Sequence, residues 1–128
     1  MKGDLVVKEL RSQTLKLDRV LKEIKRGELI QLTQDLIRIP SVRREGQGEQ
    51  KVALYLTRLL EGIGLDVVIE YVENSSPNVI AVLQGEGEGP CLMFECPPDV
   101  VTEGAPSEWK YGPVEGRLAG NRIHGTGA

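Results

Sequence analysis

Residues 52–72 read VALYLTRLLEGIGLDVVIEYV, and within this stretch the hydrophobic pattern changes from that of a helix to that of a strand. In its first half, apolar side chains recur at three- and four-residue intervals, which is typical of one face of an α-helix. Gly62 and Gly64 follow, and glycine favours the left-handed backbone with which many helices end. Residues 65–72 are then rich in β-branched side chains, which favour a strand. The stretch therefore predicts a helix that is followed directly by a strand.

Further strands are predicted along the rest of the chain. Residues 78–83, NVIAVL, and residues 91–96, CLMFEC, are short apolar runs, which are typical of strands that are buried on both faces of a sheet. Residues 115–118 and 122–124 are expected to form a hairpin across Ala119-Gly120-Asn121. The fold class that follows is α/β, with helices packed on a small mixed β-sheet of at least three strands plus this C-terminal hairpin.

Two more helices are predicted before residue 52. The first spans residues 7–24, and the second spans residues 29–37 and ends before Pro40, because proline disfavours helix at the preceding residue. Gly27 interrupts the pattern between the two helices. The first helix has a narrow apolar seam of Val7, Leu10, Thr14, Leu17, Leu21 and Ile24. This seam suits either a terminal helix that packs on its own domain or a helix that binds a second copy or a partner.

The predicted domain organisation follows from these elements. Residues 1–27 form an N-terminal amphipathic helix, a possible oligomerisation element, and residues 28–128 form the main domain. The total of 128 residues suits one domain with a core of its own.

Composition and charge exclude several classes of protein. Hydrophobic residues make up 40% and charged residues 27% of the chain, which argues against disorder and against a membrane-embedded protein. The net charge is −3 without any basic run, so neither nucleic acid nor a membrane is an expected partner. The first 27 residues lack the apolar segment of a secretory signal, and we expect a cytoplasmic protein.

Two motifs resemble binding sites but also have structural interpretations. The stretch Gly85–Gly89 alternates glycine with glutamate, but a predicted strand follows it where a phosphate loop would lead into a helix. A solvated hairpin turn between two strands is therefore favoured. Cys91 and Cys96 lie about 16 Å apart if they are in one strand, at roughly 3.3 Å per residue, which is too far for a disulfide. Both are expected to be free and half-buried.

The titratable side chains give no convincing catalytic group by themselves. The acidic residues Glu95, Asp99 and Glu103 show no spacing that would make their carboxylates converge. His124 is the only histidine of the chain, which excludes a histidine pair or a serine-histidine system within one copy. We interpret His124 as a strand residue.

Several short segments occur in an order that is specific in combination. They are LIRIPSV at 36–42, LLEGIGL at 59–65, NVIA at 78–81, PCLMFECPPDVV at 90–101, WKYGP at 109–113 and GNRIHGTGA at 120–128. Together, over about 100 residues from Glu28 onward, these segments resemble the N-terminal part of the dizinc acylase and exopeptidase family. This family includes acetylornithine deacetylase, succinyl-diaminopimelate desuccinylase, aminoacylase and glutamate carboxypeptidase. The resemblance implies a partial zinc-exopeptidase-like catalytic domain.

The resemblance also locates the zinc site of the family, and here the sequence departs from the family's pattern. Family members place a histidine, one further residue and an aspartate at the end of the third strand. The histidine binds zinc and the aspartate orients it. Asp99 matches the aspartate, whereas Pro97 occupies the histidine position and offers no ligand atom. The resemblance thus implies that Asp99 is the vestige of a catalytic residue and that this chain has no metal ligand. It also implies that this chain has no cofactor, whereas members of the family bind two zinc ions.

The other metal ligands of the family lie further along than the residues that this sequence matches. Because a two-metal hydrolase fixes its ions with several ligands, we expect a truncated relative of an N-acyl amino acid deacylase or dipeptidase that is inactive as this chain alone. We also expect a homo-oligomer that forms through the sheet edge or through the helix at residues 1–27. The alternative is a working zinc hydrolase whose remaining ligands come from another polypeptide or a longer parent chain. A third possibility is an unrelated small binding module that uses the first helix.

Overall fold

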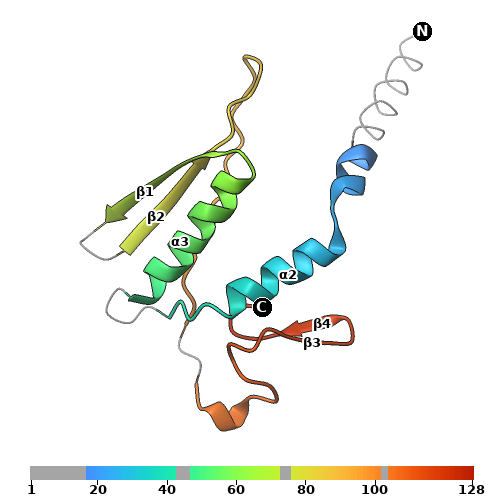
Figure 1. Cartoon of the computed structure of the whole chain (residues 1–128), viewed down its shortest axis with the longest axis vertical. Coiled ribbons are helices and arrows are strands. Elements are labelled where there is room, and N and C mark those ends of the chain that lie inside the picture. Colours follow the sequence, from blue (N-terminus) through green and yellow to red (C-terminus); the bar gives the residue numbers. More distant parts are fainter. Residues whose placement is uncertain (1–16, 43–46, 73–75, 102–103) are drawn as a thin grey trace. The chain divides into compact units, whose positions relative to one another are not determined.

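The computed structural model describes residues 17–42, 47–72, 76–101 and 104–128, which fall into two compact units, 1–32 and 33–128. Its elements are α2 (Arg26–Ile37), α3 (Gln47–Gly62), β1 (Asp66–Val72), β2 (Ser76–Val82), the 3-10 helix η2 (Pro106–Glu108), β3 (Arg117–Ala119) and β4 (Arg122–His124) (Figure 1). Residues 17–23 are helical as well. The chain therefore has helices and small antiparallel sheets, which confirms the α/β class. No helix among the described residues is both long enough and apolar enough to cross a membrane.

The first unit contains the described end of the predicted helix at residues 7–24. The seam residues Leu17, Leu21 and Ile24 are all at least half exposed, and the earlier seam residues lie outside the described ranges. The break between the two helices falls at Ile24 and Lys25, and Gly27 lies within the first turn of α2. The expected interruption at Gly27 is thus wrong by a few residues. First-turn N–H groups need no intrahelical acceptor, so glycine is tolerated there.

The predicted third helix and first strand are confirmed, and the junction between them has a well-defined cap. Gly64 has a φ of 88°, and its N–H donates to the Glu61 carbonyl at 2.9 Å. The Leu65 N–H donates to the Leu60 carbonyl at 3.1 Å. This pair of hydrogen bonds is the Schellman motif, which satisfies the last carbonyls of α3 and turns the chain into β1.

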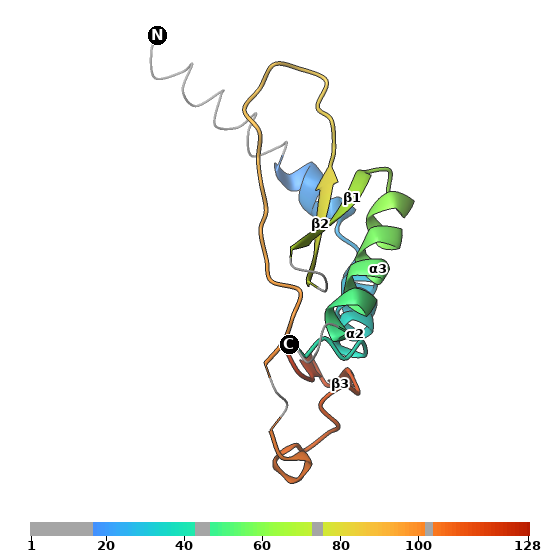
Figure 2. The same ribbon diagram turned by 90° about the vertical axis from the view of Figure 1, so that its left-hand side faces the viewer.

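α3 covers one face of the antiparallel β1–β2 hairpin (Figures 1 and 2). Alternating side chains point toward the helix because successive residues of a strand face opposite sides. The register pairs Val67 with Ala81 and Ile69 with Val79, and these four residues are partly buried. On the helix side Val52 and Ala53 are fully buried. The buried Glu49 of α3 accepts a hydrogen bond from the Ser76 hydroxyl of β2 at 3.2 Å.

The expected third strand and the mixed sheet of three or more strands are not formed by the described residues. Residues 83–99 have no strand or helix, and Figure 2 shows them as a long uncoiled trace after β2. The described strands make two separate two-stranded sheets, β1–β2 and β3–β4, both antiparallel. The apolar run at 91–96 stays unpaired because an extended segment becomes a strand only when a neighbour accepts and donates its backbone hydrogen bonds.

The C-terminal hairpin is confirmed, with a register close to the expected one. β3 and β4 pair Arg117 with His124 and Ala119 with Arg122, so the loop is Gly120-Asn121 and Ala119 belongs to the strand. Gly120 has a φ of 61°, a conformation that residues other than glycine adopt at a cost.

Candidate functional site

The positions that resemble the family's zinc motif lie just before a contact between two distant segments. Val100 forms a parallel bridge with Val42, and its N–H donates to the carbonyl of the buried Ser41 at 3.2 Å. The segments LIRIPSV and PCLMFECPPDVV therefore meet at this bridge. Asp99 is partly buried beside it, whereas Pro97 is exposed in the uncoiled segment.

The other candidate residues are not brought together into a metal site. The described part of the chain contains no group of three or more His, Cys, Asp or Glu side chains that could hold a metal ion. Cys91 and Cys96 are free, as expected, but both are exposed, so the expected half-burial is wrong. The reason is that their segment has no sheet around it. Glu95 is exposed as well, and Glu103 lies outside the described residues.

Two further candidates from the sequence are His124 and the stretch Gly85–Gly89. His124 is a strand residue of β4, as expected, and its ring meets that of Tyr111 edge to face, with 5.0 Å between the ring centroids. The stretch Gly85–Gly89 is exposed after β2, but no strand follows it, so the expected hairpin turn between two strands is wrong.

The glycine-rich end of the chain packs on the end of α2. Thr126 is buried, and the Pro113 carbonyl accepts hydrogen bonds from its N–H at 2.7 Å and from its hydroxyl at 3.1 Å. Gly125 lies against the buried Ile37 so closely that a Cβ there would overlap the Ile37 side chain. In this structure the segment GNRIHGTGA thus packs against LIRIPSV.

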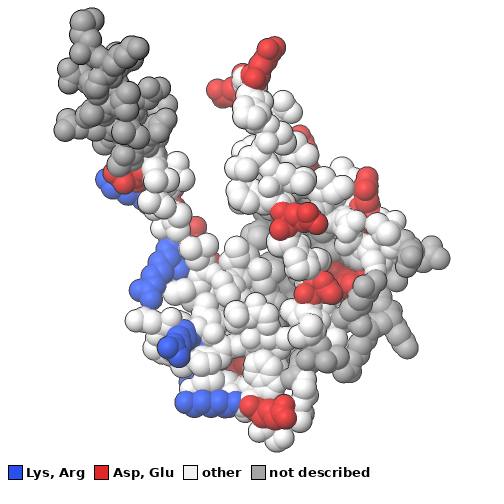
Figure 3. All heavy atoms as spheres, turned by 180° about the vertical axis from the view of Figure 1, so that it is seen from behind, with Lys and Arg blue, Asp and Glu red and all other residues white. Residues whose placement is uncertain are grey.

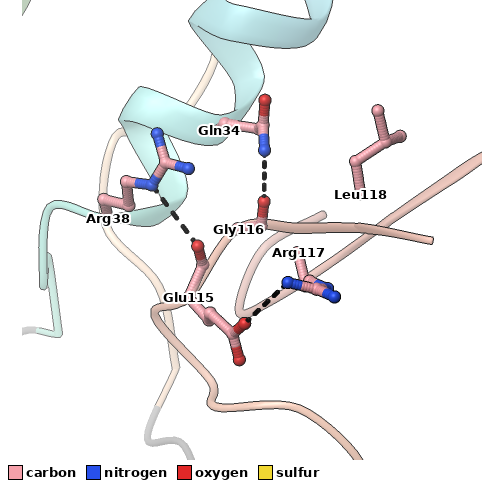
Figure 4. A pocket seen from close by; sticks show the side chains of 6 residues that line it. All are labelled: Gln34, Arg38, Glu115, Gly116, Arg117 and Leu118. Carbon is pink, nitrogen blue, oxygen red and sulfur yellow. Dashed lines mark hydrogen bonds and ion pairs between the residues drawn. The ribbon is translucent and has the colours of Figure 1, made fainter.

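A shallow polar pocket of about 240 Å³ lies where α2 ends against the start of β3 (Figure 4). Its lining residues are Gln34, Arg38, Glu115, Gly116, Arg117 and Leu118. The Gln34 side-chain amide donates to the Gly116 carbonyl at 2.6 Å, and Arg38 Nε donates to the Glu115 carbonyl at 3.3 Å. These two bonds join α2 to the approach of β3. No local sequence pattern predicts the pocket, because its two sides are more than seventy residues apart along the chain.

The arginines of the pocket have carboxylate partners within the chain. Arg38 pairs with Asp35 at 3.3 Å, and Arg117 pairs with Glu115 at 3.8 Å. Both pairs are partly exposed to solvent, where ion pairs contribute about 0–1 kcal/mol. Each arginine of the pocket therefore has a carboxylate beside it, and the hydrogen bonds from Gln34 and Arg38 hold the approach of β3 to the end of α2.

One titratable group near this region has a shifted pKa. Partial burial of Tyr55 on α3 raises its pKa above the usual 10.0, and the negative charge of Asp35 and a hydrogen bond to that carboxylate raise it further. The Tyr55 hydroxyl donates this bond. Asp35 of α2 therefore contacts Tyr55 on α3. It also contacts Arg38, which follows the last residue of α2.

Comparison with known proteins finds partial matches to relatives that share one name. The sequence is 36% identical over 99 residues to succinyl-diaminopimelate desuccinylase of Methylobacterium sp. (strain 4-46), a match that covers 76% of this chain and 24% of the relative. The enzymes of that name from Rhodopseudomonas palustris (strain BisA53) and Methylobacterium radiotolerans are 33% and 37% identical over 103 and 101 residues. Those matches cover 79% and 77% of this chain and 26% and 25% of the relatives. No family model matches the chain.

The fold and the matching segments define a small α/β chain that is related to part of an amidohydrolase. Within that class the chain is a partial match to the dizinc acylase family, through the relatives named succinyl-diaminopimelate desuccinylase. It spans about a quarter of the length of the curated relatives it matches.

Proposed function

We propose that this chain is a partial relative of the desuccinylases that has no hydrolase activity of its own and that associates with itself. The observation that carries the proposal is Pro97, which stands two residues before Asp99. By the resemblance described above, this is the position of the family's zinc-binding histidine. A proline side chain has no lone pair to donate to a metal. Without that ligand, Asp99 has no imidazole to orient.

The test is an assay of the purified chain with zinc and an N-succinyl diaminopimelate substrate, together with native mass spectrometry of bound metal. We expect no release of succinate and no stoichiometric zinc. Stoichiometric zinc would mean that Cys91, Cys96, Asp99 or His124 forms a site, and zinc-dependent hydrolysis would overturn the proposal.

A matched pair of variants tests the assignment of Pro97. In an extended segment alternate side chains face the same side, so Pro97→His would place an imidazole on the side of Asp99 and Pro98→His on the opposite side. We expect Pro97→His to bind zinc more tightly than Pro98→His, measured by titration with zinc. Equal affinities would contradict the assignment of Pro97 to the histidine position.

A second candidate function is a working zinc hydrolase whose remaining ligands come from another polypeptide or a longer parent chain. The observation in its favour is that the match covers only 24–26% of the relatives. The decisive check is the coding sequence downstream of Ala128. A continuation that encodes further aspartate, glutamate and histidine ligands in the same frame would favour this candidate, and a stop codon would exclude the longer parent chain.

The self-association in the proposal is supported by exposed apolar side chains in both units. In the first unit these are the seam residues Leu17, Leu21 and Ile24. In the second unit the outer face of the β1–β2 hairpin exposes Val68 and Val82, and this hairpin has unpaired edges among the described residues. Light scattering after size-exclusion chromatography is expected to give a mass above that of one chain, 14.1 kDa. A monomer at every concentration would refute this part of the proposal.

A further inference from the structure

The run Leu92, Met93 and Phe94 is 77%, 79% and 88% exposed, which is unusual for three consecutive large apolar side chains. The run lies in the uncoiled trace of Figure 2, where residues 91–96 belong to no strand. On the face drawn in Figure 3, acidic side chains lie scattered among uncharged ones. Within residues 91–96 the only charged residue is Glu95. The segment thus combines an available backbone with apolar side chains and little charge, which are the properties of an exposed edge strand that pairs with another chain.

We propose that residues 91–96, the pairing segment, dock on the pairing segment of a second copy of this chain as two antiparallel strands around a two-fold axis. The inference rests on the self-association proposed above and names the surface that causes it. Pro90 and Pro97 bound the segment, and proline cannot donate a ladder hydrogen bond. The paired length is therefore limited to six residues.

The geometry of antiparallel strands restricts the register. Opposed residues point to the same face, so a two-fold axis requires one residue to lie opposite its own copy. With Met93 in that position as a hydrogen-bonded pair, Leu92 lies opposite Phe94 of the second copy. These become non-hydrogen-bonded pairs, in which Cα atoms approach to about 4.5 Å and side chains pack most closely.

Charge favours the same register. When Met93 is central, Glu95 lies opposite Cys91 of the second copy, and the two Glu95 residues are separated by roughly 13 Å along the strands at about 3.3 Å per residue. When Phe94 is central, the same separation falls to roughly 7 Å. In a parallel in-register pair the two glutamates would be neighbours, and like charges directly opposite destabilise a sheet.

The area of the segment sets the expected strength of the dimer. Three such side chains expose roughly 400 Å² of apolar surface per copy, by the areas typical of large side chains and patches. Two copies would bury about 800 Å², which is less than the standard interface of about 1,600 Å². The dimer is therefore weak and depends on concentration.

Sedimentation velocity across a concentration series tests the surface. Phe94→Lys is expected to weaken the dimer about tenfold or more, because each dimer would oppose two charged side chains to two leucines. Leu83→Lys is the matched control, since Leu83 is 74% exposed but lies outside the pairing segment. Because Phe94 is exposed in the single chain, the Phe94→Lys chain is expected to fold. Circular dichroism verifies this.

The outcomes separate this inference from the proposal on which it rests. A dimer that survives Phe94→Lys but is lost in Leu21→Lys would refute the pairing segment and leave self-association through the first helix. A wild-type chain that is monomeric throughout would refute both. Equal weakening by Phe94→Lys and Leu83→Lys would also refute the pairing segment, because it would show that general surface charge decides association.

Cysteine cross-linking tests the register. In a chain with Cys91→Ser and Cys96→Ser, the variant Met93→Cys would place two thiols opposite each other at about 5.5 Å between Cα atoms, within reach of a disulfide. Oxidised glutathione forms a mixed disulfide with one thiol and releases one reduced glutathione. The second thiol then displaces the other, which leaves the cross-link.

We expect Met93→Cys to cross-link faster than Phe94→Cys and much faster than Leu83→Cys in the same background. Preferential cross-linking of Phe94→Cys would overturn the register centred on Met93. A rate for Met93→Cys no greater than that of Leu83→Cys would overturn the pairing itself.

Discussion

Asp35 shows how one side chain can connect several elements. It accepts a hydrogen bond from Tyr55 on α3 and pairs with Arg38, the residue that follows the end of α2. Arg38 in turn donates to the Glu115 carbonyl before β3. These contacts link three parts of the second unit, although each of them is partly exposed and individually weak.

The raised pKa of Tyr55 predicts a dependence of stability on alkaline pH. The folded state holds the phenol proton more tightly than the unfolded state, whose tyrosine pKa is near 10.0. The contribution to stability is therefore complete below pH 10.0 and is lost as the pH rises through the folded pKa. Urea unfolding at neutral and at alkaline pH is expected to show this loss in the wild-type chain. It should be smaller in Tyr55→Phe.

The control for this prediction is Tyr71→Phe, because Tyr71 lies exposed on β1. This variant is expected to keep the alkaline loss of the wild-type chain. If Tyr55→Phe loses stability with pH as steeply as Tyr71→Phe, the hydrogen bond to Asp35 does not determine the effect.

The roles of Pro97 and Asp99 rest on the family resemblance, and they stay predictions. The sequence could place Pro97 at the histidine position only through the resemblance, since no spacing within the chain identifies a zinc site there. Exposure of Cys91 could not be predicted from its own segment. An apolar run indicates burial, but whether a sheet surrounds it depends on distant residues.

At the scale of elements, the end of α3 was the most predictable feature. Gly64 is required at a φ of 88°, where a Cβ is strained, whereas Gly62 lies within the helix and has no atoms near its Cβ position. We expect Gly64→Ala to lower the free energy of unfolding by about 1 kcal/mol. Gly62→Ala is the matched control and should raise it by up to about 1 kcal/mol, because alanine favours helix.

Chemical denaturation of both variants measures these differences. The two substitutions lie only two residues apart, but their changes in the free energy of unfolding are expected to have opposite signs. A loss of stability in both variants would mean that packing, and not the backbone conformation, determines the effect at this helix end.

Local elements followed from the sequence, and the pairing of strands did not. The helices α2 and α3, the strands β1 and β2 and the C-terminal hairpin depend on neighbours within a few residues, so periodicity, proline and glycine indicate them. The antiparallel pairing of β1 with β2 was not predicted. The third strand at 91–96 needs a partner that is distant in sequence, and no local pattern identifies one. The hydrogen bond from Gln34 to Gly116, 82 residues away, was beyond prediction for the same reason.

At the scale of the whole molecule, burial is concentrated in few residues. Among the described residues, the buried hydrophobic ones are Ile37, Val52 and Ala53, and the last two lie on α3. Stability of a protein of this kind is marginal, and the regions with the most buried contacts open least often. The second unit therefore should not exchange its amide hydrogens uniformly.

We expect hydrogen exchange, followed by mass spectrometry in dilute solution, to be slowest in α3 and in β1–β2. The pairing segment at 91–96 should exchange as fast as an unfolded chain under these conditions, because its backbone has no ladder partner. Raising the protein concentration should slow exchange in that segment while leaving β1–β2 unchanged, since a second copy would supply the missing hydrogen bonds. Protection at 91–96 in dilute solution equal to that of β1 would instead mean that the segment is already paired within one chain, and that the third strand expected from the sequence exists.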